Sequence, residues 1–278
     1  MSNYITLEFK SIASEVSEIL VAELSEIGFY AFEEKENNLS AFIKEEDFNE
    51  HELHKIISSL KLNYVKSIIP QTNWNAKWES EFEPIIIENF VAIRASFHSA
   101  VNNVIHDIVI TPKMSFGTGH HATTFLMLQQ MKYMNFSKKS VLDFGTGTGL
   151  LAIMSKKLGA KNIVAIDNDD WSIHNARENF DVNNCGDIIL KKTDNPADQG
   201  SNKEHVKFDI ILANINLNVI TSSANILNDI SHQSTEILLS GFLVKDEQKV
   251  INTFNMLGYK HVKTVIRNEW VSMLLIKS

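Results

Sequence analysis

A glycine-rich loop at residues 145–149 could hold a cofactor close to the main chain. It has glycine at every second position, follows the apolar run 141–144 and precedes the helical pattern 150–158. Glycine leaves the backbone open to a ligand where a strand turns into a helix, and the helix N-terminus adds unpaired N–H groups. A pyrophosphate-binding loop would need its third glycine at position 150, which is Leu150 here. The spacing therefore favours a cofactor without a pyrophosphate.

Two aspartates flank this loop. Asp143 ends the preceding run, where its carboxylate can receive loop N–H groups and lie beside the cationic amine of a methionine moiety. Asp167 ends the next apolar run, roughly 20 residues on, the usual place for an acid that binds ribose hydroxyls. Asp167 can instead cap the helix that follows Asp169-Asp170. With the loop upstream we favour ribose binding, and we expect S-adenosylmethionine as the cofactor.

A second glycine turn, Phe116-Gly117-Thr118-Gly119, precedes another helical pattern and can fold over a ligand. Thr123 and Thr124 would lie in the first turn of that helix, near its N–H groups. Helix capping by threonine or by His120 is the alternative role. His120 and His121 have no Asp, Glu or Cys nearby at ligand spacing, so we expect no metal site.

An asparagine stands at the end of a third segment. The run 208–213 has the apolar character of a buried strand, and Asn214 follows at its carboxyl end, the edge where ligands of open α/β sheets bind. Its amide oxygen and the backbone carbonyls beside it can accept hydrogen bonds from an amine. Asparagine is also a common helix N-cap. Next to a sulfonium-type cofactor loop we favour Asn214 as the catalytic residue that orients an acceptor amine.

The elements that position these residues alternate between strand and helix from Ser140 onward. This order indicates a mostly parallel sheet with helices on both faces. The last two strand patterns, 260–266 and 271–276, have only a short turn, Arg267-Asn268-Glu269, between them and should form an antiparallel hairpin at the sheet edge. That ending is typical of the seven-stranded, Rossmann-like class I methyltransferase fold, and a plain dinucleotide-binding fold usually lacks it.

Residues 1–70 predict a separate, small ferredoxin-like α+β domain, because their patterns run strand, helix, strand, strand, helix, strand. The first 60 residues hold 13 acidic and 4 basic side chains, whereas the rest of the chain holds 21 and 22. The acidic excess is either a solvated face that aids solubility or a surface that attracts a basic partner. Both interpretations argue against nonspecific binding of nucleic acid, which needs a basic surface.

Residues 71–84 are expected to connect this domain to a catalytic domain over residues 85–278. In the connector, Trp74, Trp78 and Phe82 are spaced four residues apart and would share one face of a helix. We expect these aromatic side chains to dock the connector onto a domain.

The composition fits a protein of a reducing compartment. Hydrophobic residues make up 44% of the 278, enough for a packed core. No apolar run approaches the roughly 20 residues that span a bilayer, and the N-terminus has no secretory signal pattern. A single cysteine, Cys185, excludes an internal disulfide and a multi-cysteine zinc site. We expect a cytoplasmic protein without a membrane partner, and a monomer because no interface stripe is evident.

Together these segments resemble the bacterial ribosomal protein L11 methyltransferase family, whose members are class I S-adenosylmethionine-dependent enzymes. The resemblance covers nearly the whole chain and is weakest in residues 1–60. Its most specific element is the FGTGxHxTT turn. The segments that carry it are Trp74-Asn75-Ala76-Lys77-Trp78, Phe82-Glu83-Pro84, the turn from Phe116 to Thr124, the loop after Asp143, Asp167, Ala213-Asn214-Ile215 and Leu239-Ser240-Gly241-Phe242-Leu243.

The resemblance implies methylation of lysine ε-amines and an N-terminal α-amine on one large-subunit ribosomal protein, a basic partner held by the N-terminal domain. Asn168 and Asn216 depart from the residues usual in the family, the first beside the ribose acid and the second in the acceptor segment. The residues expected to bind S-adenosylmethionine are Phe116, Thr118, Gly119, His120, Thr124, Asp143, Gly145, Gly147, Asp167 and Asn214.

The expected mechanism requires alignment of an uncharged amine more than a strong acid or base, because a sulfonium carbon is already activated. A lysine arrives protonated at its reference pKa of about 10.4, and desolvation in the pocket would lower that pKa and release the lone pair. Three alternatives stay open on the sequence alone. They are a class I methyltransferase for protein glutamine, RNA or a small molecule, a nicotinamide-dependent oxidoreductase, and a cofactor-binding assembly factor without catalysis.

Overall fold

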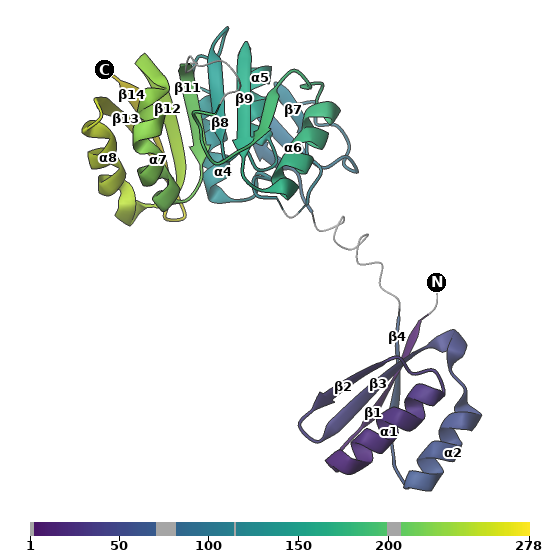
Figure 1. The fold of residues 1–278 in the computed structure, drawn as a ribbon. Helices are drawn as coiled ribbons and strands as arrows, with labels where there is room; N and C mark the ends of the chain where they lie inside the picture. Colours follow the sequence, from purple (N-terminus) through teal and green to yellow (C-terminus); the bar gives the residue numbers. More distant parts are fainter. Residues whose placement is uncertain (1–2, 71–81, 114, 199–206) are drawn as a thin grey trace. The chain divides into compact units, whose positions relative to one another are not determined.

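The structure is a computed structural model, and it describes residues 3–70, 82–113, 115–198 and 207–278. Two compact units make up the chain, Met1–Phe82 and Glu83–Ser278 (Figure 1). The predicted helical face of the connector, with Trp74 and Trp78, lies outside the described residues.

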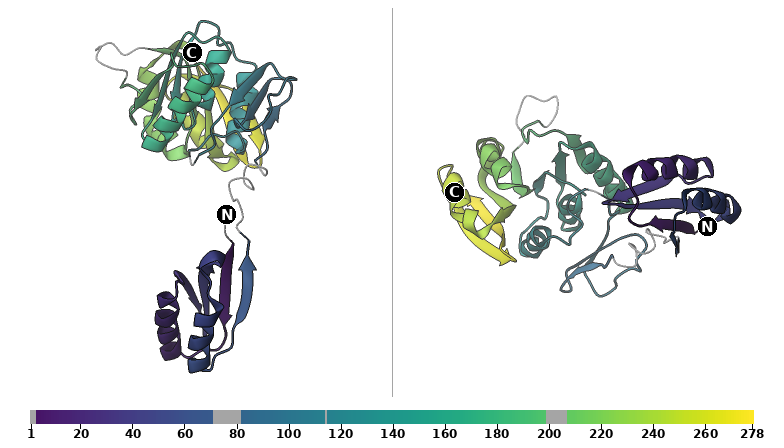
Figure 2. Two further views of the ribbon diagram at one scale, coloured as in Figure 1. Left: turned by 90° about the vertical axis from the view of Figure 1, so that its right-hand side faces the viewer. Right: turned by 90° about the horizontal axis from the view of Figure 1, so that it is seen from below.

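The first unit follows the predicted order of strand, helix, strand, strand, helix, strand. Its antiparallel sheet has the order β2-β3-β1-β4, and both helices cover one face of it (Figure 2). Leu7, Phe9, Leu20 and Leu53 are completely buried between sheet and helices. The elements are β1 (Tyr4–Phe9), α1 (Ser14–Glu26), β2 (Ala31–Lys35), β3 (Asn38–Lys44), the 3-10 helix η1 (Glu45–Asp47), α2 (Glu50–Leu60) and β4 (Val65–Ile69).

The second unit is built on a seven-stranded sheet in the order β10-β9-β8-β11-β12-β14-β13. Strands β8 to β12 run parallel to one another, whereas β14 is antiparallel to both β12 and β13. The predicted class I fold and its terminal hairpin are thus confirmed. The strands of this sheet are β8 (Ser140–Phe144), β9 (Asn162–Asp167), β10 (Ile189–Lys192), β11 (Phe208–Asn214), β12 (Ser231–Leu243), β13 (Tyr259–Arg267) and β14 (Trp270–Lys277).

Helices cover both faces of this sheet, because alternate side chains of each central strand point to opposite faces. On one face Val141 packs with Leu128 and Phe180, and on the other Leu142 packs with Phe254. Figure 1 shows α7 and α8 in front of the strands β11 to β14. The helices are α4 (Ala122–Met131), α5 (Leu150–Lys157) and α6 (Asp170–Val182) on the first face, and α7 (Leu217–Asp229) and α8 (Glu247–Asn255) on the second, with the 3-10 helix η2 (Val244–Asp246) before α8.

A small sheet of three strands precedes α4 and packs into the first face. Its order is β5-β6-β7, and Ile87, Val91 and Ile108 join the same hydrophobic cluster as α4 and α5. Among the described residues no helix is long and apolar enough to cross a membrane. The three strands are β5 (Ile85–Ile87), β6 (Val91–Arg94) and β7 (His106–Val109).

Candidate functional site

A cavity of about 690 Å³ lies at the carboxyl edge of the seven-stranded sheet. This volume is within the range of small-molecule sites. Residues that follow β8, β9, β10 and β11 line it, because parallel strands bring their carboxyl ends to one edge. Of the ten predicted cofactor residues, five line the cavity, namely Phe116, Gly145, Gly147, Asp167 and Asn214.

The two glycine turns, predicted separately, lie against each other. The Thr148 N–H donates to the Phe116 carbonyl at 3.0 Å. A Cβ on Gly147 would lie 2.3 Å from that same carbonyl oxygen, and a Cβ on Gly145 would lie 2.3 Å from Cγ2 of Ile215. These glycines therefore admit the neighbouring segments that form the cavity wall, as well as leaving the backbone accessible.

Asp167 ends β9 and ties it to the glycine loop. Its Oδ2 accepts a hydrogen bond from the Gly147 N–H at 2.9 Å, and its Oδ1 accepts one from the Asp169 N–H at 3.1 Å. The alternative role of helix cap is wrong for Asp167, because Asp169 caps α6 by accepting from the Ser172 N–H at 2.8 Å. A carboxylate has about four acceptor positions, so Asp167 keeps capacity for ribose hydroxyls.

Asp143 lies behind the glycine loop and not in the cavity lining. Its side chain is completely buried. Oδ2 accepts from the Thr146 hydroxyl at 2.6 Å and from the Ala152 N–H at 3.1 Å, in place of the expected loop N–H groups, and Oδ1 has no partner among the described residues. Burial raises the pKa of Asp143 to about 7, against the opposing effect of these two hydrogen bonds. Its contact with a methionine amine stays a prediction.

The second glycine turn contributes a different histidine from the one expected. Thr118, Gly119 and His120 do not line the cavity, and the Nε2 atom of His120 lies 3.1 Å from the Glu83 carbonyl oxygen. The residue that caps α4 is His121, whose Nδ1 accepts from the Thr123 N–H at 3.3 Å. No group of three or more potential metal ligands exists among the described residues.

Asn214 ends β11 with its two amide atoms in contrasting situations. Its Nδ2 donates to the Thr124 hydroxyl oxygen at 3.1 Å, whereas its Oδ1 is buried and has no partner among the described residues. The helix-cap alternative is wrong here too, because Asn216 caps α7 by accepting from the Val219 N–H at 3.1 Å. Thr124 is itself buried and acts by holding Asn214. The amide thus presents an open acceptor for an N–H donor.

Three aromatic rings stand together in the cavity lining. The His121 ring lies 5.2 Å from the Phe116 ring and 4.8 Å from the Trp270 ring, measured between centroids. The sequence argument missed His121 as a lining residue and Trp270 altogether. Trp270 begins β14, and the first residue of an antiparallel strand lies at the edge where the parallel strands end. The predicted hairpin could therefore have identified Trp270 as a residue near the site.

The sequence argument also missed lining residues that follow other strands. Thr193 and Asp194 come directly after β10, and Gly241 lies near the end of β12. The rule that selected Asp167 and Asn214, a position at the carboxyl end of a parallel strand, applies equally to these residues. Thr193 and Asp194 were overlooked because no motif marked them, whereas Gly241 stood in a segment that carries the family resemblance but was given no role.

The lining has the chemistry that S-adenosylmethionine requires. The Asp167 carboxylate suits a ribose, and the Asn214 Oδ1 atom is a buried acceptor that no described residue hydrogen-bonds. An unpaired buried acceptor costs about 1–3 kcal/mol, which a ligand N–H would recover. The geometry suits a site that binds a cofactor and aligns an amine.

The chain matches the family model described as Ribosomal protein L11 methyltransferase (PrmA) over residues 6–278. It is 38% identical over 283 residues to the ribosomal protein L11 methyltransferase of Chlorobaculum tepidum, covering 98% of this chain and 96% of that one. The Bacteroides fragilis enzyme of the same name is 32% identical over 277 residues, with 98% of each chain covered. The crystal structure of a ribosomal protein L11 methylase from Lactobacillus delbrueckii subsp. bulgaricus is 27% identical with a TM-score of 0.64, covering 71% of this chain and all of that chain.

Proposed function

This chain belongs to the ribosomal protein L11 methyltransferase family, and on that premise we propose that it methylates lysine ε-amines and the N-terminal α-amine of ribosomal protein L11. S-adenosylmethionine is the methyl donor of this family, and L11 methylation is the activity the family membership carries. The observation that supports an amine acceptor is the Oδ1 atom of Asn214, which is buried at the cavity and receives no hydrogen bond from any described residue.

The cofactor half of the site lies at the ends of β8, β9 and β10. When bound there, S-adenosylmethionine supplies a methyl group activated by its sulfonium. The Asp167 carboxylate would hold the ribose hydroxyls, and Thr193 and Asp194, which line the same cavity, would contact the adenine base. The Gly147 N–H donates a hydrogen bond to Asp167, so the glycine-rich loop holds in position the carboxylate that would bind the ribose.

The acceptor half lies around Asn214. The Asn214 Oδ1 would accept a hydrogen bond from the incoming amine, and Thr124 keeps the amide from rotating. The aromatic rings of Phe116, His121 and Trp270 would surround the path by which the acceptor amine enters. Partial removal of water lowers the pKa of a lysine amine and favours the neutral form that carries a lone pair. Catalysis would then come from alignment, which can contribute several orders of magnitude in rate.

The first unit is proposed to recognise the basic protein substrate. On α1, Glu15, Glu18, Glu23 and Glu26 are exposed, and none of them makes an ion pair with another described residue. Such unpaired charge attracts a basic surface and speeds encounter. Replacing the four glutamates by glutamine should raise KM for L11 and weaken its salt dependence, with kcat at saturating L11 unchanged. An unchanged KM would argue for solubility as the role of these side chains.

A methyl-transfer assay tests the proposal. The purified chain is incubated with methyl-labelled S-adenosylmethionine and purified L11, and mass spectrometry of the digested product locates the label. We expect label on lysine side chains and on the N-terminal residue, and none when the L11 amines have been acetylated beforehand. Label on glutamine, or on ribosomal RNA supplied in parallel, would refute the amine assignment. We further propose that the enzyme acts in the cytoplasm and that it is a monomer. Sedimentation of the purified chain would check the monomeric state.

A further inference from the structure

Gly241 forms a β-bulge where β12 reaches the cavity. On the antiparallel side, Ser240 pairs with Ser272 and Phe242 pairs with Val271, so β12 holds one more residue than β14 at this point. Gly241 is that extra residue, and its φ of +101° is one that L side chains rarely adopt. Bulges next to functional sites often redirect a segment. Gly241 itself lines the cavity.

The bulge brings Gly241 into direct contact with the Ile215 peptide. A Cβ on Gly241 would lie 2.0 Å from the Ile215 carbonyl oxygen and 2.7 Å from its carbonyl carbon, well under the 3.0 Å that real Cβ atoms respect. The Ile215 N–H also donates to the Ser240 carbonyl at 3.1 Å. Glycine at position 241 is therefore what allows this peptide to lie where it does.

The side chain of Ile215 is confined from the opposite direction. A Cβ on Gly145 would lie 2.3 Å from Ile215 Cγ2. Ile215 is thus clamped between a glycine of the loop after β8 and a glycine of β12, its side chain against Gly145 and its peptide against Gly241. Asn214 and Asn216, on either side of Ile215, are anchored to Thr124 and to the start of α7.

We propose that Gly241 is a positioning residue for methyl transfer, whose bulge sets the Ile215 peptide and thereby aims the Asn214 amide at the acceptor amine. The inference rests on the proposed function of Asn214. Any side chain at position 241 must push the Ile215 peptide away by roughly an ångström, and a displacement of that size can lower a rate about 100-fold. Cofactor binding depends mainly on residues of β8, β9 and β10, so it should change much less.

The test compares Gly241→Ala with Gly258→Ala as the matched control. Gly258 also has a positive φ, +83°, but an added Cβ would meet no atom of the described residues within 4 Å. Both variants force alanine into a left-handed conformation, and only Gly241→Ala displaces the Ile215 peptide. We expect Gly241→Ala to lower kcat about 100-fold. Its dissociation constant for S-adenosylhomocysteine, measured by calorimetry, should stay nearly unchanged, and Gly258→Ala should leave both quantities nearly unchanged.

Two outcomes of this comparison would overturn the inference. One is equal kcat values for the two variants. The other is a loss of S-adenosylhomocysteine affinity by Gly241→Ala that matches its loss of kcat, since that would place the effect in cofactor binding. If the unaltered chain transfers no methyl group to L11, the proposed function fails first and independently of Gly241.

A double-mutant cycle separates positioning from a general structural effect. In an Asn214→Ala background the amide that Gly241 positions is gone, so adding Gly241→Ala should lower kcat far less than it does alone. A fully additive loss would overturn the inference. Should Gly241→Ala not fold, Ile215→Ala releases the clamp from its other side. We expect it to lower kcat with little change in S-adenosylhomocysteine affinity, and an unchanged kcat would likewise overturn the inference.

Discussion

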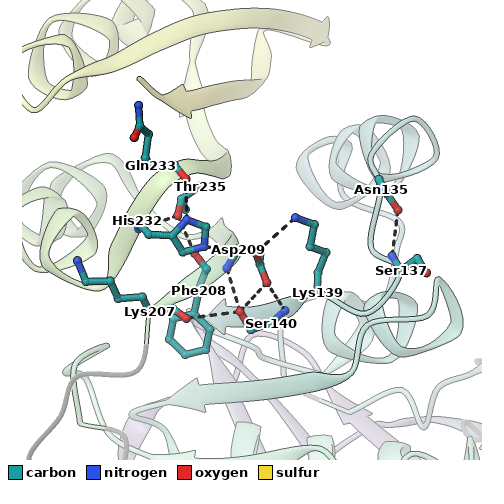
Figure 3. Close-up of polar contacts among 10 residues, drawn as sticks. All are labelled: Asn135, Ser137, Lys139, Ser140, Lys207, Phe208, Asp209, His232, Gln233 and Thr235. Carbon is teal, nitrogen blue, oxygen red and sulfur yellow. Dashed lines mark hydrogen bonds and ion pairs between the residues drawn. The ribbon is translucent and has the colours of Figure 1, made fainter.

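Two aspartates on neighbouring parallel strands show how differently the two edges of one sheet are built. Asp209, near the amino end of β11, has partners on both oxygens (Figure 3). Its Oδ2 accepts from the Ser140 N–H at 2.8 Å and from the Ser140 hydroxyl at 2.9 Å, and its Oδ1 lies 3.4 Å from Lys139 Nζ and 3.3 Å from His232 Nε2. Burial alone would raise the pKa of Asp209, but the Ser140 hydrogen bonds and the Lys139 charge outweigh it and lower the pKa.

Asp143, at the carboxyl edge on β8, is in the opposite situation. One of its oxygens has no partner among the described residues, and burial raises its pKa to about 7. The Asn214 Oδ1 at the same edge is likewise unpaired. Asp209 is thus satisfied within the protein itself, whereas Asp143 and Asn214 at the carboxyl edge each keep one oxygen without a partner among the described residues, at a cost in stability. Such groups are expected where a ligand completes the structure.

Asn214→Ala should produce the largest effect on the carboxyl edge. Loss of the acceptor that orients the amine is expected to lower kcat about 100-fold, with a much smaller change in S-adenosylmethionine affinity. Steady-state kinetics with L11, together with calorimetry, separates the two quantities. A variant that keeps full turnover would show that Asn214 does not orient the acceptor.

Asp167→Ala should weaken cofactor binding with little loss of fold. Charge-assisted hydrogen bonds to ribose hydroxyls contribute about 1.5–3 kcal/mol, so the dissociation constant is expected to rise roughly tenfold to a hundredfold. Calorimetric titration with S-adenosylhomocysteine measures it, and circular dichroism checks the fold. Unchanged affinity would reject the ribose role and leave Asp167 as a brace for the Gly147 N–H.

Asp209→Ala tests the amino edge, where stability and not catalysis should change. Removing the acceptor leaves the Ser140 N–H without its partner, and we expect a loss of about 2 kcal/mol in the free energy of unfolding. Urea denaturation measures this loss. Because the Asp209 pKa is lowered, its stabilising contribution should be present above the ordinary carboxyl pKa and disappear as the pH falls below it. A loss of kcat in the folded variant would break the contrast between the edges.

Asp143→Asn should have the smallest effect on turnover, and its effect on stability should be visible mainly in the pH dependence. In the unaltered chain the folded state holds a proton on Asp143 up to about pH 7, while the unfolded state releases it near the ordinary value of 3.8. The folded state therefore binds more protons across this window, and stability falls as the pH rises through it. The variant lacks this loss, so over the roughly three pKa units between these values we expect it to gain about 4 kcal/mol relative to the unaltered chain between pH 4 and pH 8. Urea denaturation at both pH values would reveal a constant difference if burial did not control this carboxyl.

Much of the architecture follows from local patterns. Alternating strands and helices, and a terminal turn too short for a helix, were enough to predict the parallel sheet and its antiparallel hairpin. Asp167 and Asn214 were identified because parallel strands share a carboxyl edge. The predictions of the sheet and its hairpin succeed because periodicity and strand direction are properties of short stretches of chain.

Other features needed the tertiary structure. Helix capping at the site falls to His121, Asp169 and Asn216, each close to the residue first considered, because several adjacent polar side chains can cap and the helix start decides which does. The clamp on Ile215 joins the loop after β8, the loop after β11 and strand β12, which lie far apart in the chain, and no local pattern encodes the contacts between them. The sequence by itself thus determined which residue types could bind the cofactor and orient the amine. The tertiary structure decided which acceptors lack a partner among the described residues and how closely other segments approach Gly145 and Gly241, because these features depend on how the core packs and excludes water.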